Sequence, residues 1–167
     1  FERSPAGEDP WIQATDPMGG VERYETKMGH TSVIATTDPV AEVPAGLVTN
    51  TNYRLDTAVT FHWNKRLMAQ APGDYTKAEQ IHWAWSSNSV ATGIVRARKQ
   101  PLERRLWYNF PGQTERHRLG SMAQPAKIAR KLDDGSDQVF QYEYNAQGMV
   151  TRSIDPLGRE MQYTYAA

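Results

Sequence analysis

The sequence lacks cysteine, an excess of either charge, and any long apolar segment. With no Cys among 167 residues it can form neither disulfides nor thiolate metal sites. The 19 Lys and Arg residues balance 19 Asp and Glu residues, so there is no cationic excess for nucleic-acid binding. No apolar run approaches the ~20 residues that span a bilayer. We therefore expect neither a nucleic-acid partner nor a membrane span.

Proline and glycine organise the chain, and no long window has the periodicity of an amphipathic helix. Turn sequences recur along its whole length: DPMGG (16–20), DPV (38–40), VPAG (43–46), APGD (71–74), FPG (110–112), DDG (133–135), NAQG (145–148) and DPLG (155–158). Short runs rich in Val, Thr, Tyr and Trp lie between them. Short strands with frequent turns predict an all-β, mostly antiparallel fold of hairpins and meanders.

The C-terminal third has the clearest strand pattern, over residues 138–144, 149–154 and 159–165. A period of two predicts a three-stranded meander with one apolar face. We expect that face to be buried, with Phe140, Tyr142, Tyr144, Val150, Ile154, Met161, Tyr163 and Tyr165 on it. The face of Glu143, Arg152 and Gln162 should be in solvent. Further strands are expected within 57–63, 80–85, 93–99 and 104–110, and residues 1–11 should be the least structured.

Parts of the sequence repeat. WYNFPGQ aligns with EYNAQGM, so that Tyr108, Asn109 and Gly112 match Tyr144, Asn145 and Gly148. TDPMGGVERYE aligns with IDPLGREMQYT, which matches Asp16, Pro17, Gly19 and Tyr24 with Asp155, Pro156, Gly158 and Tyr163. YEY ending at Tyr144 recurs as YTY ending at Tyr165. Each unit is a hairpin that cannot bury its own face, so neighbouring units should pack together.

These residues resemble a known family. The segment 142–165, YEYNAQGMVTRSIDPLGREMQYTY, is similar to the tyrosine-aspartate (YD) repeat of the RHS (rearrangement hot spot) proteins, and 101–113 resembles a stretch of their bacterial members. The usual Asp after Tyr is replaced by Asn109, Asn145 and Ala166. By this resemblance, 101–167 holds RHS/YD repeats, 1–100 holds divergent repeat-like hairpins, and the two form one continuous sheet.

The resemblance implies an architectural role. RHS repeats of bacterial polymorphic toxins and of the related teneurins form a curved β-strip that closes into a shell. This chain, which begins at Phe1, would be one piece of such a wall. Its partners would be the other repeats of a secreted or cell-surface parent protein and, in toxins, an enclosed effector. Its exposed edges should pair with another copy.

The residues of the repeat are expected to be structural. Tyr combines ring area with a hydroxyl, while Asp or Asn beside a turn Gly can bond the local backbone. Asp155 resembles the Asp-Pro of RHS self-cleavage sites, but no matching continuation or second carboxylate accompanies it, so we expect an internal turn. No catalytic, metal-ligating or cofactor-binding motif is found.

Other residue groups carry competing interpretations. The alternative function is a carbohydrate-binding β-module, with Trp63, Trp83, Trp85, Trp107 and Tyr108 as stacking residues. His62 and His82 could form a two-histidine site if their strands paired in register, although hydrogen-bonded strand positions are favoured. The basic residues are interleaved with Glu103 and Glu115, which favours a solvated face. They are Arg96, Arg98, Lys99, Arg104, Arg105, Arg116 and Arg118.

Overall fold

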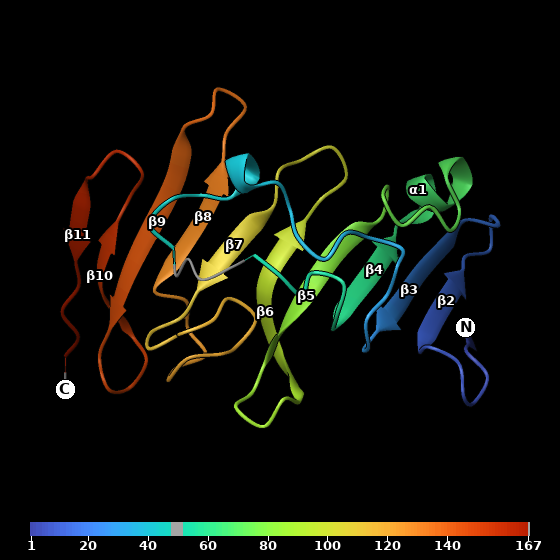
Figure 1. The fold of residues 1–167 in the computed structure, drawn as a ribbon, viewed down its shortest axis with the longest axis horizontal. Helices are drawn as coiled ribbons and strands as arrows, with labels where there is room; N and C mark the ends of the chain where they lie inside the picture. The colour runs from blue at the N-terminus through green and yellow to red at the C-terminus, as the bar shows by residue number, and fades with distance from the viewer. Residues whose placement is uncertain (48–51, 167) are drawn as a thin grey trace.

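A computed structural model describes residues 1–47 and 52–166, and its main element is one β-sheet (Figure 1). In chain order, the strands are β1 (Glu2–Arg3), β2 (Trp11–Thr15), β3 (Val21–Lys27), β4 (Val59–Trp63), β5 (Glu79–Trp85), β6 (Ala91–Lys99), β7 (Leu106–Asn109), β8 (Lys127–Lys131), β9 (Asp137–Tyr144), β10 (Val150–Ile154) and β11 (Glu160–Gln162). A short helix, α1 (Lys65–Gln70), follows β4, and a single 3₁₀ turn spans Val40–Glu42.

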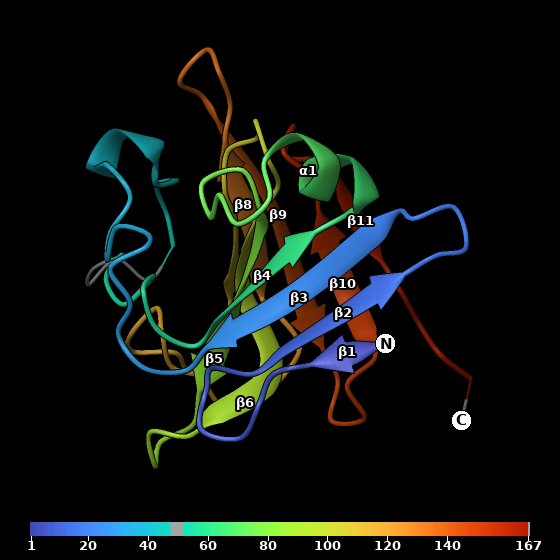
Figure 2. The same ribbon diagram turned by 90° about the vertical axis from the view of Figure 1, so that its right-hand side faces the viewer.

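The sheet has eleven strands in sequential order, and every neighbouring pair is antiparallel. This confirms the predicted all-β class of consecutive hairpins. The strand direction rotates along the sheet, so that the N-terminal strands cross the C-terminal ones in Figure 2. Because Ala97 pairs with Trp107, the sheet is continuous across the predicted boundary at residue 100. The division there into two kinds of repeat stays a prediction. Residues 1–11 are more ordered than expected, because β1 pairs with β2.

The connection from β3 to β4, residues 28–58, crosses one face of the sheet, and we call it the strap. It lies on one side of the sheet in Figure 2. Its middle part reaches β8 and β9, where Lys127 Nζ donates to the Gly46 carbonyl at 2.7 Å. The Ala45 amide donates to Asp137 Oδ2 at 3.2 Å. The face beneath the strap is called the covered face and the other is the open face.

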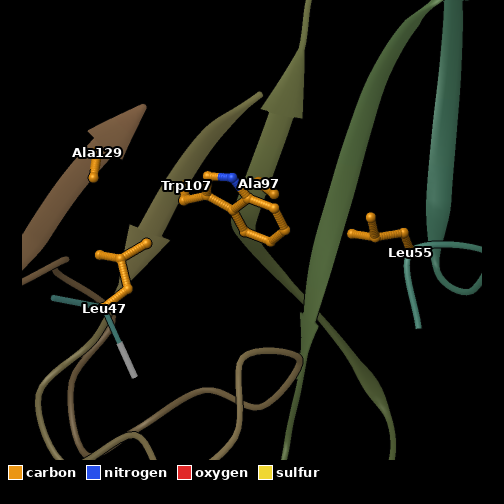
Figure 3. Packing of buried hydrophobic residues seen from close by; sticks show 5 residues of the cluster. All are labelled: Leu47, Leu55, Ala97, Trp107 and Ala129. Atoms are coloured by element: carbon orange, nitrogen blue, oxygen red, sulfur yellow. The ribbon is translucent and has the colours of Figure 1, made fainter. Parts of the chain in front are cut away.

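Two apolar clusters fill the covered face. In the first, the strap residues Leu47 and Leu55 pack with Trp107 and with the alanines of β6 and β8 (Figure 3). Small residues on these strands leave room for the indole of Trp107, which is 2% exposed. The strap therefore supplies part of the core that the sheet alone could not form.

The second cluster is centred on β4 and lies beneath α1. Its buried members are Val59, Phe61, Trp63 and Ala78, with Leu67, Met68 and Tyr75 packed against them. The helix begins at the cap residue Asn64, whose side chain accepts a hydrogen bond from the Leu67 amide at 3.0 Å. The cap directs the apolar side of the helix onto the strand that precedes it.

The open face has no comparable cover among the described residues. Ile12, Tyr24 and Met161 lie on it, with exposed fractions of 47%, 39% and 61%. The residues expected on one apolar face of the C-terminal meander lie on both faces of the sheet. Ile154 pairs with Gln141, whereas Tyr142 pairs with Ser153, so Ile154 and Tyr142 point to opposite faces. The bulge between Val150 and Arg152 causes this shift, which the period-two pattern did not reveal.

Candidate functional site

Three turns of the predicted repeat have the same hydrogen-bond pattern. Their first residues are Asp16, Asn145 and Asp155, and the side-chain oxygen of each accepts the amides two and four residues later. The donors are Met18 and Gly20 at 2.9 and 2.8 Å, Gln147 and Met149 at 3.0 and 3.0 Å, and Leu157 and Arg159 at 2.9 and 3.0 Å. The aligned sequences at Asp16 and Asp155 therefore build equivalent hairpin turns, and the turn at Asn145 has the same geometry.

The fourth residue of each turn is a glycine in the left-handed region. The φ angles are +83° at Gly19, +78° at Gly148 and +78° at Gly158. This is the geometry of a three-residue hairpin loop that ends in a glycine bulge. Pro17 and Pro156 occupy the second position, where their fixed φ suits the turn.

The carboxylate of Asp155 is occupied by its own turn. Desolvation raises the pKa of Asp155, but the amides of Arg159 and Leu157 and the Arg159 guanidinium lower this pKa below its ordinary value overall. The guanidinium lies 2.6 Å from Asp155 Oδ2. An ionised carboxylate with these bonds is suited to holding the turn.

Two further turns share the backbone pattern, at 86–90 and 132–136. In the first, the Ser86 amide donates to Val90 O at 2.8 Å and the Ser89 amide to Ser86 O at 3.1 Å. Ser89 takes the left-handed position with a φ of +59°. Sequence reasoning missed this turn because it contains neither Gly nor Pro.

The predicted equivalence of Asn109–Gly112 with Asn145–Gly148 is wrong. Asn109 is buried and its side chain donates to Gln113 Oε1 at 2.5 Å, while the chain continues into the connection 110–126. Gln113 Nε2 donates to the carbonyls of Arg116 and Arg118 at 3.2 and 2.6 Å. Gln113 therefore organises a wide loop at the place where the repeat predicts a tight hairpin.

The expected burial of the tyrosine rings is also wrong for several positions. Tyr24, Tyr163 and Tyr165 are 39%, 37% and 48% exposed, and Tyr108, Tyr142 and Tyr144 are half-buried. Their strands present these rings to the open face or to the last edge of the sheet, which the strap does not reach.

The hydroxyls of two repeat tyrosines nevertheless join separate segments. Tyr144 donates to the Pro125 carbonyl at 2.9 Å, and Tyr165 donates to the Val150 carbonyl at 2.7 Å. Tyr163 lies 3.2 Å from the hydroxyl of Ser153. The phenol groups thus connect a strand to the main chain or side chain of its neighbour.

The tryptophans do not form the stacking platform of the carbohydrate-binding alternative. Trp63 and Trp107 are 1% and 2% exposed, so neither can offer a ring face to a sugar. Trp83 and Trp85 are half-buried, and the pairing register shifts between them. Trp83 donates to Thr60 on the open face at 2.8 Å.

His62 and His82 lie on opposite faces, which rules out the two-histidine site. His82 pairs with Val59 of the buried cluster, whereas His62 pairs with Tyr24 on the open face. The His62 ring stacks on the Tyr24 ring, with centroids 4.1 Å apart and an interplanar angle of 4°. Among the described residues no group of His, Asp and Glu is arranged to hold a metal ion.

His62 belongs to a charged group on the open face. Its ring nitrogens lie 2.9 Å from Glu79 Oε2 and 2.7 Å from Glu22 Oε1, and Arg98 also donates to Glu79. Burial raises the pKa of Glu79, but Arg98 and His62 lower this pKa below its ordinary value overall. The group links β3, β4, β5 and β6 through hydrogen bonds, and the lowered pKa leaves Glu79 ionised at pH 7.

The expectation that the basic residues form a solvated face is wrong for three of them. Arg96, Arg105 and Arg116 are 1%, 4% and 8% exposed. Arg96 donates to the carbonyls of Trp83 and Arg54 at 3.1 and 2.6 Å. Burial and the neighbouring Arg105 charge lower the pKa of Arg96 to about 9. Arg96 and Arg105 join the strap to the sheet, because Arg96 bonds Arg54 and Arg105 bonds Asp38.

Two buried histidines accompany the arginines. His82 is 0% exposed and receives a hydrogen bond from Arg105, and burial lowers its pKa well below the ordinary value. His117 is 2% exposed, and burial lowers its pKa to about 4. Both rings are therefore neutral at pH 7, in contacts suited to holding the covered face together.

Comparison with known protein families finds no family model that matches the chain, and a search of curated proteins finds no match. No helix within residues 1–47 and 52–166 has the length and apolarity needed to cross a membrane.

Proposed function

We propose that this chain is a non-catalytic structural segment of an RHS-type protein and forms part of the wall of a β-shell. The observation that carries the proposal is one turn geometry that recurs at Asp16 and Asp155, which are matched in the sequence, and again at Asn145. The turns join consecutive antiparallel strands of a sheet that does not close on itself. Such a sheet can be extended by further hairpins at either edge.

The position of the exposed tyrosines supports the same role. Tyr163 and Tyr165 follow β11 at the last edge of the sheet. A further hairpin added at that edge would cover their rings. The parent protein would then be secreted or displayed at the cell surface, with its other repeats, and any enclosed effector, as partners.

Electron microscopy of the parent protein tests the proposal. We expect a hollow β-shell in which residues 1–166 form a stretch of wall with strands paired beyond both β1 and β11. A separate globular domain with both edges capped would contradict it. Binding of the chain to a glycan array tests the carbohydrate-binding alternative. We expect no binding, because Trp63 and Trp107 are buried.

A further inference from the structure

A groove lies between the helix α1 and the turn that joins β6 to β7. Both elements follow strands that run the same way, so they lie at the same end of the sheet (Figure 1). The groove has a volume of about 500 Å³, and its apolar lining comes from Leu67 and Ala71 on one side and from Pro101 and Leu102 on the other. It adjoins the central strands β4 to β7, so its opening does not depend on what pairs with the first or last strand.

The turn at 100–103 carries a leucine that its own geometry does not favour. The Glu103 amide donates to Gln100 O at 3.2 Å, and Pro101 precedes a residue with a φ of +65°, which is the pattern of a type II turn. The third position of such a turn normally holds Gly or Asn, because a larger side chain there strains the backbone. Leu102 occupies this position with its side chain 98% exposed. No packing within the described chain therefore accounts for this leucine.

The groove is positively charged. Arg66 and Lys77 line it, and no acidic residue of the described chain does so. Neither cation forms an ion pair with a described residue. Thr76 and, more weakly, Lys77 lower the pKa of Asp74, but this carboxylate already accepts hydrogen bonds from the Thr76 amide and hydroxyl at 2.9 and 2.7 Å. Glu103 lines a separate hollow on the other side of the turn. The two cations are thus available to an anionic ligand.

We propose that this groove binds a peptide segment of a partner protein in which apolar side chains are flanked by carboxylates. The apolar side chains would occupy the floor between α1 and the turn, and the carboxylates would pair with Arg66 and Lys77. Leu102 stands in solvent beside the groove, so a ligand that also covers Leu102 must be larger than the groove itself. A protein segment meets this condition, whereas a small carboxylate in the groove would leave Leu102 in water.

The turn holds Leu102 in place before a partner binds. Pro101 fixes one backbone dihedral, and Gln100 Nε2 donates to Glu79 Oε1 at 2.7 Å, which ties the turn to β5. A segment fixed in this way loses little conformational entropy on binding. A strained backbone that presents an exposed apolar side chain is therefore suited to recognition.

Synthetic peptides blocked at both ends test the chemistry of the ligand. The probes are DELLDE, in which carboxylates flank two leucines, its basic counterpart KKLLKK, and its polar counterpart DESSDE. In NMR titrations of the chain, we expect saturable shifts of the Leu67, Ala71 and Leu102 amides with DELLDE and none with the other two peptides. Equal binding of KKLLKK or DESSDE, or no binding of DELLDE, would overturn the proposal.

The variant Leu102→Gly separates recognition from folding. Glycine relieves the strain of the left-handed φ, so this variant should be at least as stable in urea as the native chain. We nevertheless expect its Kd for DELLDE to rise ~tenfold, because an apolar contact is lost at the interface. Leu157→Gly is the matched control, since Leu157 is a turn leucine that is 79% exposed outside the groove, and its Kd should not change. Native affinity in Leu102→Gly would overturn the proposal.

Charge reversal tests the role of the two cations. Arg66→Glu and Lys77→Glu should each weaken DELLDE binding ~tenfold, since each replaces an attraction by a repulsion. Arg3→Glu is the control, because Arg3 is an exposed cation on β1 outside the groove. Equal losses in all three variants would show that only the net charge matters, which would overturn the proposed site.

Other occupants of the groove give different results. Octanoate, a small carboxylate with an apolar chain, should bind much more weakly than DELLDE, and equal affinity would make the groove a site for small molecules instead. Shifts of the same amides on concentrating the chain without peptide would indicate that a second copy binds there. The titration is repeated with the parent protein, where loss of DELLDE binding would show that the parent fills its own groove. Each of these three results would overturn the proposal.

Discussion

The Asp38 carboxylate and the Arg105 guanidinium, 67 residues apart in the chain, form a two-point ion pair beneath the strap. Arg105 Nε lies 2.6 Å from Asp38 Oδ2, and Arg105 Nη2 lies 3.2 Å from Asp38 Oδ1. Arg105 also donates to Gln80 and His82 on β5. One side chain of the strap thus satisfies a buried cation that would otherwise have only neutral partners.

Loss of the Asp38 carboxylate should be costly. Asp38→Ala leaves a buried guanidinium without its counter-ion, and we expect the free energy of unfolding to fall by ~3–5 kcal/mol. Urea denaturation measures this loss. Asp133→Ala is the control, because Asp133 pairs with the neighbouring Arg104 but is 100% exposed. That change should cost less than ~1 kcal/mol, and equal losses in both variants would contradict the account.

The sequence predicted the strands and most turns because both depend on local signals. Alternation located β9 to β11, and the Asp-Pro-x-Gly sequences located two of the capped turns. The turn at 86–90 escaped because Ser89 has a left-handed φ that its residue type does not signal. Local chemistry thus identified elements wherever the local sequence determined the backbone.

The faces of the sheet could not be assigned in the same way. Burial depends on the strap, which has no strand or helix periodicity and packs against residues far away in the sequence. Arg96 and Arg105 have the sequence context of exposed strand positions, yet the strap covers them. Tyr163 has the context of a core residue, yet nothing described covers it. Long-range contacts decided each of these outcomes.

The hydroxyl of Tyr144 should contribute a measurable part of the stability. Tyr144→Phe keeps the half-buried ring but removes the hydrogen bond to the Pro125 carbonyl, so we expect a loss of about 1 kcal/mol in urea denaturation. Tyr144→Ala should lose less than the ~3–5 kcal/mol of a fully buried aromatic residue, because the ring is only half-buried. Tyr163→Phe is the control and should lose less than Tyr144→Phe. A Tyr144→Phe variant as stable as the native chain would show that the bond contributes nothing.

Acidification should destabilise the fold through its buried histidines. The pKa of His117 is about 4 in the folded chain, below its ordinary value, so the unfolded chain binds more protons at intermediate pH. The free energy of unfolding should therefore fall as the pH drops from 7 towards 4, and His82 acts in the same direction. For His117 alone, we expect a loss of about 1–2 kcal/mol between pH 7 and 5.

Variants separate this effect from general acid sensitivity. His117→Gln should reduce the pH dependence between pH 7 and 5, since glutamine does not titrate. His30→Gln is the comparison variant, because the His30 side chain is 71% exposed and bonds the Asp56 carboxylate at 2.8 Å. Thermal or urea melts at several pH values supply the free energies. If the pH dependence were unchanged in His117→Gln, protonation of His117 would not be the cause of the loss of stability at low pH.

The oxygen of Asp155, and not its charge, should stabilise the last hairpin. Asp155→Ala removes the acceptor for the Leu157 and Arg159 amides in an exposed turn, and we expect the free energy of unfolding to fall. Asp155→Asn keeps that oxygen and loses only the ion pair with Arg159, whose side chain is 76% exposed, so it should be nearly as stable as the native chain and more stable than Asp155→Ala. Urea denaturation gives the free energy of unfolding of each variant. Hydrogen exchange of the Tyr163 amide reports directly on the pairing of β10 with β11. If Asp155→Asn lost as much as Asp155→Ala, the charge would matter more than the turn, and the equivalence of Asp155 with the neutral Asn145 would not hold.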